Sequence, residues 1–235
     1  MLYQQRDRLG LAEERYEEAL RICTFLEGKG CERALYISSL LGCVYSKQGR
    51  VDDALRIHKR VLRRLHRLHG DQHDTVAGVL CTVADLLRRK GRLEESKAKL
   101  EEAYAILVGL HGEDHEGVAQ ALSSIALVLK EQGKVVEAVA MQEKALGIKR
   151  RTLVGSDRNG VAEELLNLGM SYKEQGMLEE ALGRYEEGLG IVRRIHPERN
   201  VTEGKFLKNI GIVYYKQGRL DDALAWLKKA HRIFR

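Results

Sequence analysis

The chain has 235 residues, with a single Pro and 44% apolar content. It is rich in Ala, Leu, Glu, Lys and Arg, which favour helices, so the composition predicts an all-α protein. Lys and Arg number 40 against 34 Asp and Glu, an excess that matters only if it is localised. No stretch approaches the roughly 18 apolar residues of a membrane helix, and the start lacks the apolar core of a signal peptide. We therefore expect a cytoplasmic protein.

The sequence divides into consecutive repeats of about 42 residues. Residues 1–30 hold a partial repeat, and complete repeats are expected at about 31–73, 74–115, 116–158, 159–200 and 201–235. Each consists of two amphipathic stretches with apolar residues at helical spacing, which predicts a helical hairpin. Because the chain opens inside a repeat and no polar capping helix closes it, we expect a fragment of a longer array. Its uncapped ends could associate end to end.

Five glycines recur along the sequence at intervals of 42, 42, 43 and 42 residues: Gly49, Gly91, Gly133, Gly176 and Gly218. A fixed period of this size indicates a repeat array. We call them the turn glycines, because glycine adopts the left-handed conformation that ends a helix without a Cβ penalty. Small residues precede and follow each of them at helical spacing, which lets the two helices approach closely.

A second set of glycines marks the turns from one hairpin to the next: Gly28, Gly70, Gly112 and Gly155. Helix N-termini need side chains that accept hydrogen bonds from free N–H groups. The candidate caps at the expected helix starts are Asp74, Asn159, and Asn200 or Thr202. The two His-x3-His pairs, His69/His73 and His111/His115, recur at the repeat period, which an architectural linker predicts and a single metal site does not.

The repeat pattern resembles that of the tetratricopeptide repeats. The residues that carry the resemblance are Leu168-Gly169, Tyr172, Gly176, Ala181 and Gly188-Leu189. The 42-residue period and the His-Gly-x-x-His linkers resemble those of kinesin light chains and their relatives. The resemblance implies a right-handed superhelical solenoid of antiparallel helix pairs whose concave face, formed by the first helix of each pair, binds a peptide.

The same resemblance gives candidate groove residues at corresponding positions of the first helices. In the first three complete repeats they are Tyr36, Ser39, Cys43 and Ser46, then Cys81, Asp85 and Arg88, then Ser123, Leu127 and Lys130. In the last two they are Leu166, Asn167, Met170 and Lys173, then Lys205, Lys208, Asn209, Ile212 and Tyr215.

These residue types suggest what the groove would bind. The amides of Asn167 and Asn209 could hold an extended peptide backbone, because an amide both donates and accepts. Lys173, Lys205 and Lys208 would favour an acidic peptide. The sequence thus predicts a non-enzymatic scaffold or adaptor for protein partners; the alternative is that these side chains face solvent or bond within the scaffold.

One segment, residues 56–69, holds six Lys and Arg and no acid. Its polar face is predicted to carry Arg56, Lys59, Arg60, Arg63 and Arg67. This face suggests a second function, electrostatic docking on nucleic acid or an anionic membrane, or else a solvated surface. Nucleic acid is the less favoured ligand because no aromatic residues are interleaved to stack bases.

The sequence supplies no catalytic constellation and suggests no cofactor or metal. The cysteines, Cys23, Cys31, Cys43 and Cys81, have neither CxxC spacing nor the density of a disulfide scaffold, so we expect unpaired thiols. No His is placed by sequence to activate one of them. A regulatory array belonging to a larger enzyme is a third interpretation.

Overall fold

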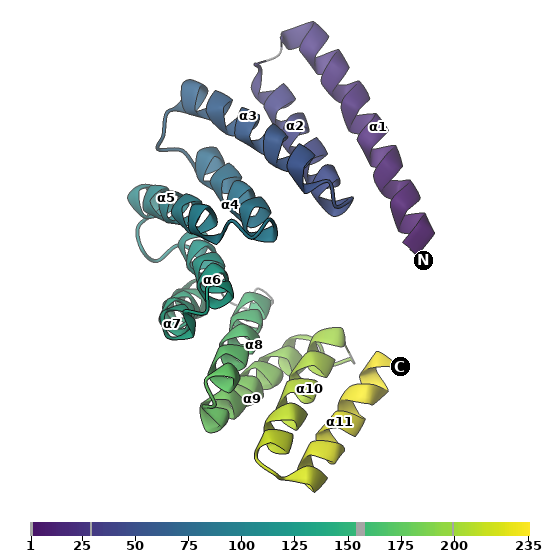
Figure 1. Cartoon of the computed structure of the whole chain (residues 1–235), viewed down its shortest axis with the longest axis vertical. Coiled ribbons are helices and arrows are strands. Elements are labelled where there is room, and N and C mark those ends of the chain that lie inside the picture. The colour runs from purple at the N-terminus through teal and green to yellow at the C-terminus, as the bar shows by residue number, and fades with distance from the viewer. Residues whose placement is uncertain (1, 29, 154–157, 199) are drawn as a thin grey trace. The chain divides into compact units, whose positions relative to one another are not determined.

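The computed structural model describes residues 2–28, 30–153, 158–198 and 200–235. Helices account for almost all of this part: α1 (Leu2–Glu27), α2 (Glu32–Lys47), α3 (Val51–His69), α4 (Asp74–Arg89), α5 (Leu93–His111), α6 (Glu116–Glu131), α7 (Val135–Thr152), α8 (Asn159–Glu174), α9 (Leu178–Ile195), α10 (Val201–Lys216) and α11 (Leu220–Phe234) (Figure 1). No strand occurs among the described residues. The all-α prediction is confirmed.

The chain divides into two compact units, Met1–Leu110 and His111–Arg235. In the first unit α1, α2 and α3 each pack against the next helix along the chain, and Ser96 of α5 donates to the Ala84 carbonyl of α4. In the second unit each helix from α6 to α10 packs against the next. Within each unit consecutive helices therefore form the antiparallel pairs that the repeat predicts (Figure 1). Whether the repeats continue from one unit into the other as a single solenoid stays a prediction.

The turn glycines end the first helix of each pair as expected. All five have positive φ, from 73° at Gly91 to 82° at Gly49. The residue after each glycine donates its N–H to the carbonyl of the large residue four before the glycine, as Arg50 does to Tyr45 at 2.9 Å and Met177 to Tyr172 at 3.0 Å. This bond satisfies a carbonyl that the helix end leaves free.

Close helix approach explains the glycines inside the helices. A Cβ on Gly42 would lie 2.6 Å from the His58 ring, one on Gly169 would lie 2.5 Å from the Tyr185 ring, and one on Gly211 would lie 2.8 Å from Leu227. The partner stands nine residues after the turn glycine in each case. Each of these glycines therefore provides the space for a side chain of the second helix.

The helix caps differ from the prediction at two of three places. His73 caps α4 through its ring nitrogen, which accepts the Thr75 N–H at 3.2 Å, while Asp74 is already the first helical residue. Asn159 likewise begins α8 and forms no cap, so both predictions are wrong. Asn200 does cap α10, with its side-chain oxygen accepting the Glu203 N–H at 2.8 Å. The cap of α4 is thus the imidazole of His73, one residue before the predicted Asp74.

The paired histidines of the linkers are structural. The rings of His69 and His73 stack with centroids 4.2 Å apart, and those of His111 and His115 stack at the same distance. His115 caps α6 as His73 caps α4, accepting the Gly117 N–H at 3.2 Å. Both pairs thus join the end of one hairpin to the start of the next, as an architectural linker requires. Gly155 lies outside the described residues.

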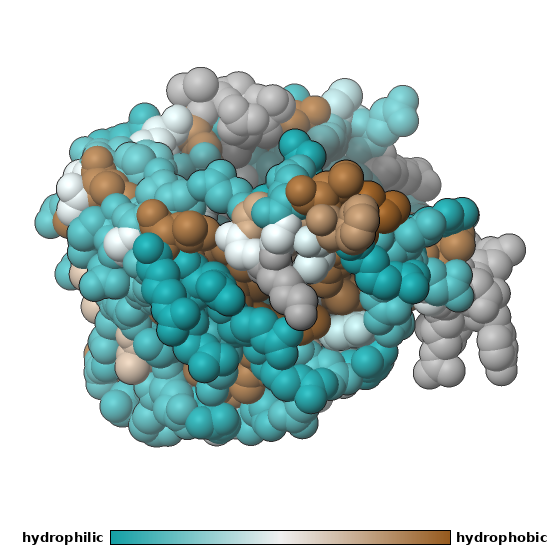
Figure 2. Space-filling view, turned by 90° about the horizontal axis from the view of Figure 1, so that it is seen from above, coloured by the Kyte–Doolittle hydropathy of each residue, from teal (hydrophilic) through white to brown (hydrophobic). Residues whose placement is uncertain are grey.

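The surface carries both hydrophilic and apolar residues. Figure 2 shows one face on which hydrophilic residues predominate and apolar residues gather in patches. Helix α1 exposes Leu11, Ile22, Phe25 and Leu26. None of the described helices is long and apolar enough to cross a membrane.

Candidate peptide-binding site

The first helices of the second unit, α6, α8 and α10, are linked by side chains that repeat in register. Lys130 stands three residues before its turn glycine, and its ammonium group pairs with Glu174, two residues before the next turn glycine, at 3.2 Å. We call this pair of positions in neighbouring repeats a rung. The rung from α6 to α8 is therefore an ion pair.

The next rung, from α8 to α10, holds two cations, Lys173 and Lys216. Lys173 instead donates to the side-chain oxygen of Asn209 at 2.9 Å. Burial lowers the pKa of Lys173; Glu174 opposes this, while the charges of Lys216, Lys130 and Lys208 lower the pKa further. Like charges disfavour the protonated form in the same direction as burial.

We refer to these four residues, Lys130, Lys173, Lys208 and Lys216, as the lysine cluster. Within it, Lys208 and Lys216 are exposed, whereas Lys130 and Lys173 are half-buried. Lys205, one turn before Lys208 on α10, is exposed as well. The cluster is a region of positive charge in which one rung lacks a carboxylate.

The two asparagines that were predicted to hold a peptide backbone differ in their surroundings. Asn209 is engaged within the scaffold, because its oxygen accepts from Lys173 and its nitrogen donates to the Lys205 carbonyl at 3.0 Å. Asn167 is exposed on α8. Asn209 would have to exchange these bonds to bind a ligand, so the alternative of bonding within the scaffold applies to it.

The apolar candidates of this unit also differ. Leu127 is 43% exposed and Tyr215 is 65% exposed. Leu166 and Met170 are partly buried and pack against the core of the second unit, and Ile212 is half-buried. The exposed apolar surface is therefore smaller than the sequence predicts, and it consists mainly of one residue on α6 and one on α10.

Ser123 belongs to a buried polar cluster that the sequence reasoning missed. Lys149 on α7 pairs with Glu164 on α8 at 2.7 Å, and their side chains are only 8% and 1% exposed. Ser123 donates to the same carboxylate at 2.5 Å. The equivalent positions of the other repeats hold apolar residues: Leu65, Leu107, Val192 and Phe234 for Lys149, and Ile37, Val79, Ala121 and Phe206 for Glu164. This departure from the repeat was the signal that could have revealed the pair.

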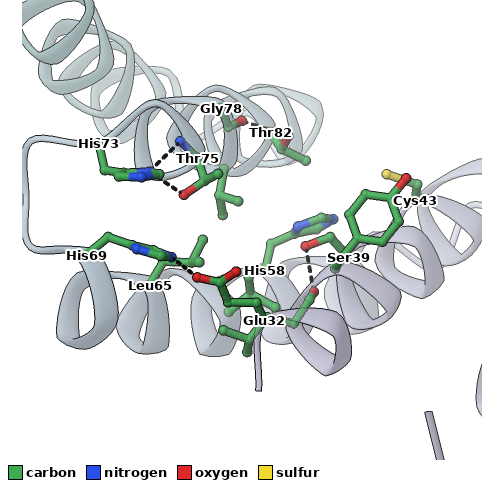
Figure 3. Close-up of a pocket in the computed structure, with 14 residues that line it drawn as sticks. Glu32, Ser39, Cys43, His58, Leu65, His69, His73, Thr75, Gly78 and Thr82 are labelled. Atoms are coloured by element: carbon green, nitrogen blue, oxygen red, sulfur yellow. Dashed lines mark hydrogen bonds and ion pairs between the residues drawn. The ribbon is translucent and has the colours of Figure 1, made fainter. Parts of the chain in front are cut away.

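In the first unit, three candidate residues of α2 line a pocket of about 540 Å³ between α2, α3 and α4: Tyr36, Ser39 and Cys43. Figure 3 shows the side chains of these helices facing one another around it, with the stacked rings of His69 and His73 at one end. Glu32 pairs with His69 at 3.1 Å. The pocket lining is mostly apolar, with Leu35, Val61 and Leu65 among its residues.

His58 lies in this pocket wall. It is buried, and neither ring nitrogen has a hydrogen-bond partner among the described residues. Burial lowers the pKa of His58, because the charged ring would lose hydration without gaining a partner. Leu100, Gln142, Tyr185 and Leu227 occupy the equivalent positions, so the ring chiefly fills space beside Gly42.

The remaining candidates of the first unit are Ser46 on α2 and three residues on α4, and the pocket lining does not include them. Asp85 and Arg88 form an ion pair with each other at 2.7 Å. Cys81 is half-buried, and burial raises the pKa of its thiol. Ser46 on α2 accepts from Arg89, which also donates to the Ser46 carbonyl at 3.2 Å. These polar groups are largely engaged within the unit.

The basic face of α3 is exposed. The five residues concerned are Arg56, Lys59, Arg60, Arg63 and Arg67. Arg56 pairs with Asp53 at 2.5 Å, and Arg63 donates to the Lys59 carbonyl at 3.4 Å. The apolar side of the helix holds the buried Val61, Leu62 and Leu65, whereas Leu68 is 50% exposed.

Solved structures with similar folds include repeat proteins. BtubC (BKLC) from P. vanneervenii is 24% identical with a TM-score of 0.80, over 97% of this chain and 90% of that one. The nearly identical TPR-like repeats of a putative kinesin light chain from Podosopora anserina are 20% identical with a TM-score of 0.74, over 85% of this chain and 94% of that one. The apo form of RapI is 17% identical with a TM-score of 0.75, over 93% of this chain and 58% of that one.

Sequence comparison gives the family. No curated protein matches the chain. The model of the tetratricopeptide repeat matches residues 1–67, 36–107, 75–151 and 161–235, which together cover nearly the whole chain. The helix pairs, the turn glycines and the small residues beside them are the features that this repeat requires. The chain belongs to the tetratricopeptide repeat family.

Proposed function

We propose that this protein is a non-enzymatic, cytoplasmic interaction scaffold that binds an acidic peptide segment of a partner protein along α6, α8 and α10. Family membership supports a scaffold for protein partners. The observation that carries the choice of ligand is the rung between Lys173 and Lys216, where the preceding rung has Lys130 and Glu174. A carboxylate of the ligand would occupy the place that Glu174 takes one repeat earlier.

The apolar part of the ligand would contact α10. Lys208, Ile212 and Tyr215 are spaced by four and three residues, so they lie on one side of the helix. Tyr215 is the most exposed of the four apolar or aromatic candidates on α8 and α10, which are Leu166, Met170, Ile212 and Tyr215. A peptide with acidic residues beside an apolar one therefore fits this face best.

The test uses two charge-reversed variants with the same net charge. Lys205→Glu with Lys208→Glu alters the proposed face, whereas Lys144→Glu with Lys228→Glu alters exposed lysines on α7 and α11. The probes are fluorescent peptides of alternating Glu and Leu and their Gln and Leu counterparts, and the measurement is fluorescence anisotropy. A charged hydrogen bond contributes about 1.5 to 3 kcal/mol, so the first variant is expected to weaken binding at least about tenfold.

Three results would reject this function. One is equal binding of the Glu and Gln peptides, a second is equal weakening by the two variants, and a third is affinity that does not change with salt. The variants must first show the same helicity and melting temperature as the native chain. Capture from cytosol with the same pair of variants would then identify partners that are lost only with the first.

A second candidate function rests on the exposed basic face of α3. Its five cationic side chains face solvent on one helix, which suits an anionic membrane better than nucleic acid because no aromatic residues accompany them. Reversal of Arg60 and Arg63 to Glu should abolish sedimentation with vesicles that contain phosphatidylserine and leave neutral vesicles unaffected. Vesicle binding that persists in this variant would reject the candidate.

A further inference from the structure

Three metal-ligand side chains converge where α1 turns into α2. Cys23 and Glu27 belong to α1, and Cys31 is the residue that caps α2. The two sulfur atoms lie 3.4 Å apart, and all three ligand atoms lie within 4.8 Å of one another. This site is separate from the lysine cluster and from the pocket of Figure 3.

The local fold accounts for the convergence. Cys23 and Glu27 are four residues apart, so they share one side of α1. Gly28 follows with a φ of 91°, which lets the chain reverse, and Cys31 then starts α2 with its sulfur accepting the Ala34 N–H at 3.3 Å. The turn thus returns the second thiol to the first.

We propose that Cys23, Glu27 and Cys31 bind one zinc ion. Zinc takes thiolate sulfur at about 2.3 Å and carboxylate oxygen at about 2.1 Å in a tetrahedron, which places two sulfurs about 3.8 Å apart and sulfur and oxygen about 3.6 Å apart. The present separations differ from these by only about an ångström. Cys31 is half-buried and Glu27 is exposed, so water can take the fourth position.

The charges around the site suit this ion. Binding of Zn²⁺ releases one proton from each thiol and leaves two thiolates, one carboxylate and a net charge of −1. Arg33, which pairs with Glu27 at 2.5 Å, supplies a compensating positive charge and orients the carboxylate.

The experiment is a titration of the reduced 235-residue chain with Cd²⁺, which replaces Zn²⁺ and gives an ultraviolet thiolate-to-metal absorption band. Two matched double variants distinguish the proposed ligands Cys23 and Cys31 from the other two cysteines, Cys43 and Cys81. Cys43→Ser with Cys81→Ser keeps the proposed ligands and is expected to bind one ion per chain with native affinity. Cys23→Ser with Cys31→Ser is expected to lose the band, and competition with a chromophoric chelator should show at least tenfold weaker Zn²⁺ binding.

Two further variants address folding and the role of Arg33. If Cys23→Ser fails to fold, Cys31→Ser alone decides, because that residue is only half-buried. Arg33→Ala should weaken Zn²⁺ binding by about tenfold while the band persists. The proposal is overturned if the native chain shows no band, if the band survives loss of Cys23 and Cys31, or if these two thiols form a disulfide and the reduced chain binds no metal.

Discussion

Equivalent rungs in the two units differ in which of the two repeats supplies the cation. In the first unit Arg89 of α4 donates to Ser46 of α2, so the cation belongs to the later repeat. In the second unit Lys130 of α6 pairs with Glu174 of α8, so the cation belongs to the earlier repeat. The position in the repeat determines which residues meet, whereas the residue types determine the charge that each unit presents. A scaffold can therefore change its ligand without changing its packing.

The buried ion pair of the second unit gives the largest expected effect. Lys149→Leu would leave Glu164 buried without a cation, and loss of one partner of such a pair costs about 3 to 5 kcal/mol in the free energy of unfolding. Adding Glu164→Val, which restores the apolar residues of the other repeats, should recover most of this loss. Urea denaturation measures both, with Lys144→Leu on the exposed side of α7 as the control. Similar stability of the single and double variants would contradict the argument.

Close packing at the helical glycines gives the next effect. Gly169→Ala places a Cβ against the Tyr185 ring and Gly42→Ala places one against the His58 ring, and overpacking of this kind costs about 1 to 3 kcal/mol. Gly183→Ala on the open side of α9 meets no atom within 4 Å and should instead stabilise by up to about 1 kcal/mol. Thermal unfolding compares the three. A gain in melting temperature for Gly169→Ala would show that the ring moves away at little cost.

His58 predicts a smaller effect that is confined to acid pH and to the first unit. Its folded-state pKa lies below the ordinary value of 6.5, so below pH 6.5 the unfolded chain binds a proton that the folded chain does not. Stability is therefore full above that pH and falls as the pH drops toward the folded-state pKa. His58→Leu, the residue found at two equivalent positions, should flatten this part of the profile of unfolding free energy against pH. An unchanged slope would exclude His58 as its source, and His231→Leu in the second unit is the control.

Lys216→Glu gives the smallest effect and bears directly on the rungs. It would turn the rung between Lys173 and position 216 into an ion pair like that of Lys130 and Glu174, and such a pair contributes about 0.2 to 1 kcal/mol. The pKa of Lys173 should rise at the same time, because a repelling charge becomes an attracting one. Lysine-selective NMR titration measures the pKa of Lys173, and thermal unfolding measures the change in stability. Loss of stability would mean that the two side chains do not meet.

The repeat pattern predicted the fold well because its signals are local. Turn glycines, small residues at helical spacing and amphipathic stretches each act within one hairpin, and all agree. The caps were harder: Asp74 and Asn159 are good capping residues by type, but the stacked His69 and His73 place an imidazole at the helix start of α4 first. The capping preferences of single residue types do not predict a contact between side chains on either side of a linker.

The candidate site was predicted less completely. Corresponding positions identified Lys173 and Lys208, but the involvement of Lys216 and the engagement of Asn209 depend on how α8 packs against α10. Lys149 and Glu164 were missed because each was considered in its own helix, where a charged residue is ordinary. Only their pairing across α7 and α8 explains why charge replaces an apolar residue at both positions.

The imidazole caps and the carbonyl bonds at the turn glycines have a consequence for how such a chain can lengthen. The hairpins that begin with α4 and α6 satisfy backbone groups both at their inner turns, beside Gly91 and Gly133, and at their starts, through His73 and His115. A whole hairpin can then be duplicated or deleted by recombination at a linker without stranding a polar group in the new junction. Gene-level gain and loss of 42-residue cassettes is thereby made compatible with folding.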